Sequence, residues 1–317
     1  MAIQLVKNAD LAALDRTIRT GFMDAYNNPS YQPRWPIFGT RQPSASAKNI
    51  YPQMIDAASV REWSEAERRI NGLVLEGATV QNQLWELSYG IRRIDLDDDM
   101  TGAVQAMMSR VRSGAAKYLR HPDRLMGNVI KTNGNCLDGL ALFHATHKVN
   151  PADPASDTYS NTTTGALTAD NLSSARATML ALKNPDGDPA NENPSVLLVP
   201  PALETIARKL TQADIIVYAS GVAAPETNVF KGSLTVVVMP QLAAAFDNGS
   251  DSAWYLIDAT DPEDRALIFQ DREAVEMVTR FNPSDPGVFD LDMYTWGTRA
   301  RYTVAGGNPK KIFRRTG

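Results

Sequence analysis

The chain has 317 residues, of which 43% are hydrophobic, and this length allows a substantial core that we expect to be divided between two lobes. The formal net charge of −4 argues against a dedicated nucleic-acid-binding protein, and the single cysteine, Cys136, excludes an internal disulfide. Because no apolar run reaches about 18 residues and the start lacks a signal-peptide pattern, we expect no membrane partner and synthesis in a reducing cytoplasm.

The N-terminal part of the chain predicts a short amphipathic helix over residues 8–26, in which apolar side chains recur on one face. Residues 27–51 lose this periodicity and have too little apolar surface to become ordered alone. One interpretation is a mobile terminus. The other, which the aromatic residues of the segment favour, is an extended arm that docks on a second copy of the chain through Trp35 and Phe38.

Residues 55–95 predict a β-ribbon, since apolar and polar residues alternate between Val80 and Leu87. Charged residues gather in its first half and could form a solvated face. Alternatively they pair across a contact with another copy, where mixed signs would set the register more than the affinity. The candidate contact residues of this segment are Arg61, Glu62, Trp63, Arg68, Arg69, Trp85 and Glu86.

A long helix is predicted next. The three aspartates 97–99 can cap its N-terminus and suit the helix dipole. Apolar residues from Met100 to Tyr118 then recur at steps of three and four, which gives one apolar stripe. Pro122 is expected to end the helix. At 1.5 Å per residue it would be about 30 Å long, enough to form the backbone of a domain.

The second half of the chain mixes helices and strands without a strict βαβ repeat, which indicates the α+β class. Thr168 is a candidate cap for the first of its helices. Helices are predicted at 168–182 and 203–210, and strands at 196–199, 215–218, 234–239, 254–257, 267–270, 274–281 and 299–302.

Two features suggest catalytic or metal chemistry without completing it. His144 and His147 could share an ion if they lay on one helix, but no His-Glu-x-x-His motif or cysteine pair accompanies them. Cys136 is expected to be a buried small hydrophobe rather than a nucleophile. Nucleotide-binding glycine motifs and a nucleophile elbow are absent from the sequence. We therefore expect no catalytic, cofactor-binding or metal-ligating residues, and no enzyme.

A series of short motifs follows a fixed order over most of the chain. They are Arg61-Glu-Trp63, Val80-Gln-Asn-x-x-Trp-Glu86, Gly90-Ile-x-Arg-x-Asp95, the acidic triplet 97–99, Leu167-Thr-Ala-Asp-Asn-Leu172, Val196-Leu-Leu-Val-Pro-Pro-Ala-Leu-Glu204, and Trp254-Tyr-Leu-Ile-Asp258 followed by Ile268-Phe-Gln270. In this order they resemble the major head subunit, or major capsid protein, of Mu-like phages and prophages.

The resemblance implies a Hong Kong 97-type capsid fold within the α+β class. Its expected parts are an N-terminal arm (1–54), an extension-loop β-ribbon (55–96), a peripheral domain with the spine helix (97–165 and 261–317) and an axial domain (166–260).

The resemblance also implies a structural function. Copies would form pentamers and hexamers of an icosahedral shell around double-stranded DNA, in the virion, after synthesis in the host bacterial cytoplasm. A scaffold, a maturation protease, a portal and decoration proteins are implied as partners. The basic residues near the C-terminus could then be a solvated tail or a patch that makes weak, salt-sensitive contact with packaged DNA. They are Lys310, Lys311, Arg314 and Arg315.

Two alternatives stay open at this point. The same fold could form an encapsulin-like compartment around a cargo enzyme. A metal-dependent hydrolase centred on His144, His147 and Asp138 is the alternative from a different class. Closed shells or small oligomers in electron micrographs would separate assembly from the enzyme.

Overall fold

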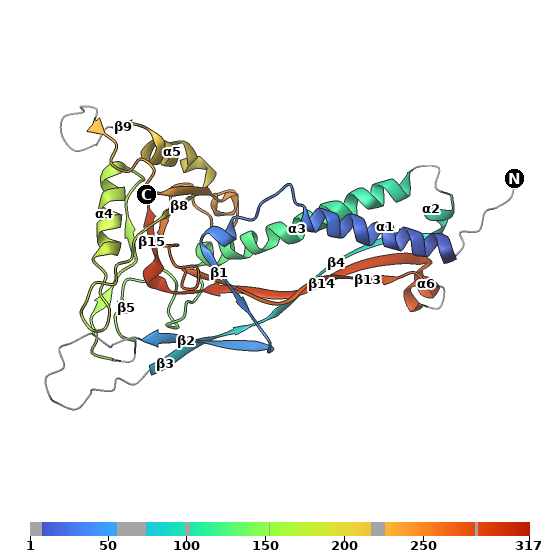
Figure 1. Cartoon of the computed structure of the whole chain (residues 1–317), viewed down its shortest axis with the longest axis horizontal. Helices are drawn as coiled ribbons and strands as arrows, with labels where there is room; N and C mark the ends of the chain where they lie inside the picture. Colours follow the sequence, from blue (N-terminus) through green and yellow to red (C-terminus); the bar gives the residue numbers. More distant parts are fainter. Residues whose placement is uncertain (1–7, 56–73, 99–101, 152, 217–225, 283–284) are drawn as a thin grey trace. The chain divides into compact units, whose positions relative to one another are not determined.

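The structure is a computed structural model, and it describes residues 8–55, 74–98, 102–151, 153–216, 226–282 and 285–317. Figure 1 shows the chain with its helices and strands labelled. The chain divides into two compact units, each made of three segments. Unit 1 comprises Met1–Pro33, Asn82–Asp123 and Asp271–Thr303, and unit 2 comprises Arg34–Gln81, Arg124–Gln270 and Val304–Gly317.

Unit 1 contains helix α1 (Asn8–Asn27), which confirms the helix predicted at the N-terminus. Its apolar face is buried, and Phe22 packs edge-on against Tyr118 of the long helix α3 (Ala103–Thr132) at 6.5 Å between ring centroids. Arg19 donates to the carbonyl of Met277 at 2.9 Å, and Trp296 donates to Asp15 at 3.1 Å. These contacts attach α1 to the sheet of unit 1.

Within unit 1 this sheet has the strand order β13-β14-β4. Its strands are β13 (Leu267–Arg280), β14 (Met293–Gly306) and β4 (Gln83–Arg92), whereas β1 (Gly39–Pro43) belongs to unit 2. Strand β14 pairs antiparallel with β4, from Met293 opposite Arg92 to Tyr302 opposite Gln83. The two strands predicted at 267–270 and 274–281 are one strand, because the charged residues between them continue the ladder with their side chains partly exposed.

Helix α3 has 30 residues and does not end at Pro122, so that prediction was wrong. A proline inside a helix removes one backbone hydrogen bond at a cost of about 3 kcal/mol, which tertiary packing can offset. Met126 and Ile130, beyond the proline, are fully buried in unit 2. The predicted stripe before the proline is confirmed, since Met107 and Val111 are buried.

The aspartates 97 and 98 do not cap α3. Asp97 is the last residue of the short helix α2 (Arg93–Asp97), and the backbone N–H of Asp98 closes that helix on the carbonyl of Ile94 at 3.0 Å. Asp99 and Met100 lie outside the described residues. Two helices follow each other in this part of the chain, and Asp97 and Asp98 belong to the end of the first, α2.

Unit 2 contains a β-ribbon of β2 (Lys48–Ile55) and β3 (Val74–Gln81), paired antiparallel. The alternating run from Val80 to Leu87 therefore does not form one strand pair, because it separates at Asn82 into β3 and β4. Tyr51 of the ribbon donates to Gln270 at 2.7 Å, which ties β2 to the body of unit 2.

The second sheet of unit 2 has the order β11-β8-β12-β15-β7. Strand β8 (Val196–Val199) is parallel to β11 (Thr235–Val238) and antiparallel to β12 (Trp254–Ile257). Strand β12 is antiparallel to β15 (Ile312–Thr316), which is parallel to β7 (Thr162–Thr164). The basic segment near the C-terminus is thus largely a strand of this sheet and not a solvated tail.

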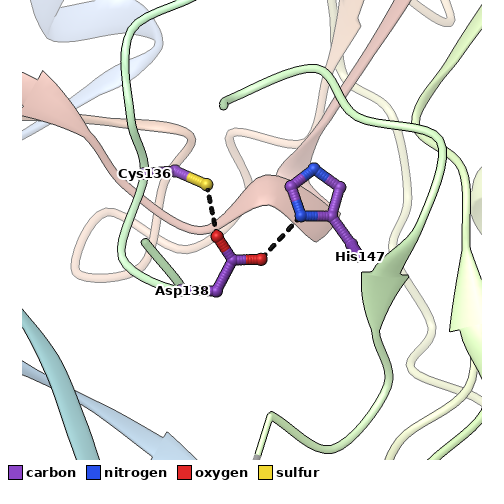
Figure 2. A group of neighbouring side chains, drawn as sticks. All are labelled: Cys136, Asp138 and His147. Atoms are coloured by element: carbon purple, nitrogen blue, oxygen red, sulfur yellow. Dashed lines mark hydrogen bonds and ion pairs between the residues drawn. The ribbon is translucent and has the colours of Figure 1, made fainter. Parts of the chain in front are cut away.

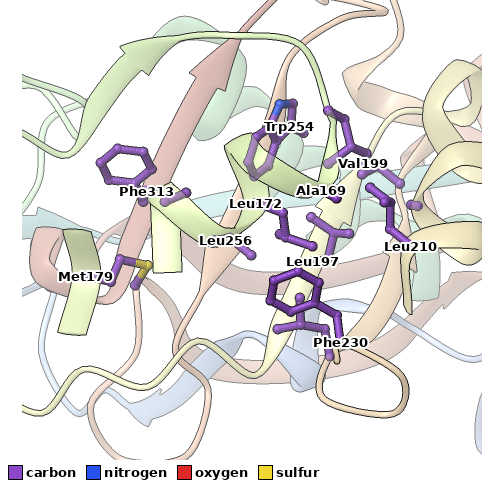
Figure 3. Packing of buried hydrophobic residues seen from close by; sticks show 14 residues of the cluster. Ala169, Leu172, Met179, Leu197, Val199, Leu210, Phe230, Trp254, Leu256 and Phe313 are labelled. Carbon is purple, nitrogen blue, oxygen red and sulfur yellow. The ribbon is translucent and has the colours of Figure 1, made fainter. Parts of the chain in front are cut away.

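The core of unit 2 lies between this sheet and two helices, α4 (Ala169–Leu180) and α5 (Glu204–Gln212). Figure 3 shows Trp254, Leu197 and Leu172 converging in this core. Thr168 caps α4 by accepting from the N–H of Asn171 at 3.2 Å, as predicted. Trp254 is fully buried and donates to the carbonyl of Gly165 at 3.0 Å.

The remaining elements are short. They are β5 (His147–Lys148), β6 (Thr158–Tyr159), β9 (Ile215–Ile216), β10 (Glu226–Thr227), α6 (Pro286–Leu291) and four single turns of 3₁₀ helix, η1 (Trp35–Ile37), η2 (Pro201–Leu203), η3 (Pro240–Leu242) and η4 (Pro309–Lys311). Within the described part of the chain, none of the helices is long and apolar enough to cross a membrane.

Candidate functional site

The structure places the candidate contact residues of β4 on opposite faces of the strand. Trp85 is half-buried in unit 1, where its Nε1 donates to the carbonyl of Tyr302 at 2.9 Å. Its ring meets the ring of His121 edge-on at 4.3 Å between centroids. Trp85 therefore contacts its own subunit through α3 and β14.

The opposite face of β4 is exposed and carries charges of both signs. Leu84 is 61% exposed, and Glu86 is exposed beside it. In the ladder Arg299 lies opposite Glu86, and Arg301 lies opposite Leu84. Both arginines pair with Glu273 of β13, at 3.0 and 3.1 Å. We call these five residues the outer face of unit 1.

The arm residues also contact their own subunit. Phe38 is fully buried in unit 2, and Trp35 packs on Phe269 with 4.6 Å between ring centroids. Ile37, between them, is 40% exposed. Local packing within unit 2 thus accounts for both aromatic side chains that the sequence suggested for docking. The other candidates, Arg61, Glu62, Trp63, Arg68 and Arg69, lie outside the described residues.

The C-terminal lysines are held by groups of unit 2. Lys311 pairs with Glu192 at 2.6 Å and with Asp258 at 3.4 Å. Burial raises the pKa of Glu192 to about 7, against the opposing effect of Lys311. Lys310 donates to the carbonyl of Lys183 at 3.1 Å.

The two C-terminal arginines are engaged in the same way. Arg315 is buried and donates to Asn171 at 2.6 Å and to Ser174 at 3.1 Å. The guanidinium of Arg314 lies over the ring of Phe143, 4.5 Å from its centroid. These cationic groups stabilise the sheet of unit 2, and much of their charge interacts with groups of the same subunit.

A cluster that contains two residues of the hydrolase alternative, Asp138 and His147, together with Cys136 in place of His144, lies between α3 and β5. Cys136, Asp138 and His147 converge there (Figure 2). The thiol of Cys136 donates to Oδ1 of Asp138 at 2.9 Å, and Nδ1 of His147 lies 2.6 Å from Oδ2 of the same carboxylate. Cys136 and His147 are buried, as we expected for the cysteine. The sequence signal for this cluster was the spacing Cys136-x-Asp138 followed by His147.

The predicted His144 and His147 pair does not share one helix. His144 lies in a loop, where its Nδ1 accepts from the backbone N–H of Thr146 at 3.2 Å, while His147 begins β5. Their ring centroids are 5.8 Å apart. Both histidines are hydrogen-bonded, His144 to Thr146 and His147 to Asp138.

Two asparagines hold the loop that carries the cluster. The side chain of Asn133 accepts from the N–H of Phe143 at 2.7 Å and donates to its carbonyl at 3.0 Å. Asn161 accepts from the N–H of His144 at 2.9 Å and donates to the carbonyls of Leu142 and Pro309 at 2.7 and 3.1 Å. The loop is therefore fixed at several backbone positions.

The order of the three groups in the cluster excludes a cysteine–histidine nucleophile. In such a pair the histidine takes the thiol proton, whereas here the carboxylate of Asp138 lies between thiol and imidazole. Burial and the charge of Asp138 raise the pKa of Cys136 well above its usual range. Burial would also raise the pKa of Asp138, but hydrogen bonds from His147 and Cys136 outweigh this effect and lower it. The thiol therefore stays protonated near neutral pH.

Comparison with protein families matches almost the whole chain. The family described as Mu-like prophage major head subunit gpT matches residues 11–169, 162–242 and 243–314. A search of curated proteins found no match.

Comparison with solved structures identifies capsid proteins. A chain of the bacteriophage JBD30 procapsid has a TM-score of 0.56 at 21% identity, over 98% of this chain and 76% of that one. A capsid chain of the native GTA particle has a TM-score of 0.55 at 11% identity, over 89% of both chains. The encapsulin SrpI of Synechococcus elongatus PCC 7942 has a TM-score of 0.52 at 10% identity, over 90% and 88%. The predicted α+β fold of Hong Kong 97 type is confirmed.

Proposed function

The chain belongs to the Mu-like prophage major head subunit gpT family, and we propose that its copies close into an icosahedral head that encloses double-stranded DNA. As a member of this family it is a phage major capsid protein, a structural component of the virion that assembles from many copies. It is not an enzyme, so the hydrolase alternative was wrong. The single observation that carries this conclusion is the family match from residue 11 to residue 314.

We assign the parts of the capsid fold as the resemblance implied. They are an arm (1–54), an extension loop (55–96), a peripheral domain (97–165 and 261–317) and an axial domain (166–260). In support, helices α4 and α5 and strands β8, β11 and β12 all fall within the axial range. Strand β3 falls within the extension-loop range, but its partner β2 lies almost entirely within the range of the arm, so the two ranges share one ribbon.

The outer face of unit 1 is our proposed contact between subunits within this head. Its exposed apolar residue, Leu84, lies among charges of both signs, and the exposed Glu86 lies opposite Arg299. Such a surface can bury one apolar side chain while charge complementarity sets the register. Trp85 supports this contact indirectly, since it fixes β4 against α3 from the other side. Phe38 is fully buried in unit 2 and is no longer a candidate, whereas the half-buried Trp35 and the ribbon residues 61–69 remain candidates for contacts made elsewhere in the assembly.

The finer partners are also proposals. Packaged DNA would make weak, sequence-independent contact with the basic residues Lys310, Lys311, Arg314 and Arg315. This contact would use the positive potential that their partners within the subunit do not neutralise. A scaffold, a maturation protease, a portal and decoration proteins would act on or join the head. Synthesis would take place in the host bacterial cytoplasm.

Electron microscopy and native mass measurement of the purified full-length protein test the assembly. Closed shells are expected, and a compact monomer that does not associate at high concentration would contradict the proposal. Glu86→Arg should lower the yield of shells by reversing one charge of the outer face. Gln83→Ala, at an exposed position of the same strand, is the matched control and should leave the yield unchanged, whereas Ser88 would be unsuitable because it donates to Glu86 at 2.7 Å. Equal yields for both variants would remove this face from the interface.

An encapsulin-like compartment is the second candidate, favoured by the likeness to the Synechococcus elongatus encapsulin. It shares the fold and differs in contents. Shells isolated from the native source with double-stranded DNA inside support the head, whereas shells with a protein cargo and no DNA support the compartment. The family match favours the head.

A further inference from the structure

We propose that Cys136, Asp138 and His147 bind one zinc ion, which pins the loop between α3 and β5 inside unit 2. A thiol sulfur, a carboxylate oxygen and an imidazole nitrogen lie within 4.8 Å of one another there (Figure 2). This site is independent of the outer face of unit 1, and its test does not depend on whether shells form.

The donor set selects the metal. Magnesium and calcium take oxygen ligands, so a sulfur donor disfavours both. Zinc accepts sulfur, nitrogen and oxygen donors and takes four ligands in a tetrahedron. Three protein groups leave one position, which suits a water molecule. Structural zinc sites usually have four protein ligands, so this site differs from them in its open position, and the role proposed for the ion is to hold the buried loop.

The charges of the three donors match a divalent cation. When zinc binds, the thiol releases its proton to solvent and forms a sulfur–zinc bond, and the imidazole of His147 coordinates through Nδ1 as the neutral tautomer whose proton has moved to Nε2. Thiolate and carboxylate then contribute two negative charges against the two positive charges of zinc. The site as a whole becomes neutral, and a neutral group costs far less to bury than a charged one.

The geometry requires only a small rearrangement. Zinc–ligand bonds of about 2.0–2.3 Å in a tetrahedron place neighbouring donors roughly 3.4–3.6 Å apart. Now the sulfur lies 2.9 Å from Oδ1 of Asp138, and Nδ1 of His147 lies 2.6 Å from Oδ2. The sulfur and the imidazole nitrogen, which lie within 4.8 Å of each other, must instead come closer to reach the same spacing, so these shifts of the donors are on the order of 1 Å. Side-chain rotation can supply this, because Asn133 and Asn161 hold the backbone of the loop.

The second histidine provides a matched control. His144 is half-exposed in the same loop, and its Nδ1 is turned to Thr146 instead of the cluster. Replacing it with alanine removes a nearby imidazole and leaves the three proposed ligands in place.

The experiment uses the full-length protein, stripped of metal by a chelator and then equilibrated with zinc chloride or cobalt chloride. About one zinc per chain is expected for the wild type and for His144→Ala, as four-coordinate sites bind a single ion. Cobalt should produce the near-ultraviolet absorption band of a cobalt–thiolate bond. Cys136→Ser should lose this band, and Asp138→Asn should weaken zinc binding by at least about tenfold.

Two outcomes would overturn the proposal. The first is wild-type protein that takes up no zinc and shows no cobalt–thiolate band. The second is zinc uptake that Asp138→Asn leaves unchanged. The wild-type measurements need no variant, so they decide the question even if Asp138→Asn fails to fold. Where zinc binds, the midpoint of thermal unfolding should rise with zinc concentration in the wild type and in His144→Ala only.

Discussion

Replacing Asn161 with alanine should destabilise unit 2 more than almost any other single polar substitution. The Asn161 side chain is buried and makes three hydrogen bonds to backbone groups, those of His144, Leu142 and Pro309. Alanine leaves these three groups without their partner. A buried group left unpaired costs about 1–3 kcal/mol, so for three such groups the free energy of unfolding should fall by at least about 3 kcal/mol.

Urea unfolding of unassembled subunits measures this loss as a lower midpoint at unchanged slope. Asn161→Asp keeps the acceptor for the N–H of His144 but loses both donors, so it should be similarly unstable. Ser160→Ala is the control, because that half-buried hydroxyl bonds only to the next residue but one, donating to the carbonyl of Thr162 at 2.9 Å and accepting from its N–H at 3.3 Å. A loss below about 1 kcal/mol for Asn161→Ala would show that water replaces the amide, and the reasoning would then be refuted.

Three further predictions concern local features. Thr168→Ala should lower the free energy of unfolding by about 1 kcal/mol in urea titration, since it removes the cap on the N–H of Asn171, whereas Thr168→Ser should be nearly neutral. The pKa of Glu192 is about 7 in the folded protein, above its usual value of 4.5. The carboxyl therefore binds a proton more tightly in the folded state than in the unfolded state. The stability that this proton contributes is lost as pH rises from about 4.5 to 7. Glu192→Gln should remove this part of the fall in the free energy of unfolding with rising pH, measured by unfolding experiments between these pH values. An unchanged pH dependence would assign the fall to other groups. Gly77→Ala should reduce shell yield in electron micrographs, because a Cβ there would meet the backbone oxygen of Tyr51 at 2.4 Å and push β2 from β3; normal yield would mean that the ribbon can spread without loss of assembly.

Local sequence patterns determined those elements whose signals are short and self-contained. The periodic apolar face of α1, the cap and apolar spacing of α4, and the short apolar runs of β8 and β12 were all predicted within a few residues. In each case the side chains that define the element lie within one or two turns, or within one strand. The order of weak motifs along the chain was sufficient for the capsid family, because a fixed order adds information that no single motif contains.

Tertiary structure decided the features that depend on residues far apart in the chain. Helix α3 continues through Pro122 because buried Met126 and Ile130 beyond it are covered by unit 2. The basic C-terminal segment is a strand because β12 and β7 flank it.

The convergence of Cys136, Asp138 and His147, the proposed zinc ligands, depended on tertiary structure in the same way. The sequence shows Cys136 and Asp138 close together but does not show that His147 turns away from His144 and toward Asp138. Local propensity describes what a segment prefers alone, whereas burial and hydrogen bonding with distant groups can outweigh such preferences of a few kcal/mol. That is why the sequence alone determined the family and the local elements, while only the folded chain determined the ends of its helices, the partners of its strands and the cluster at Asp138.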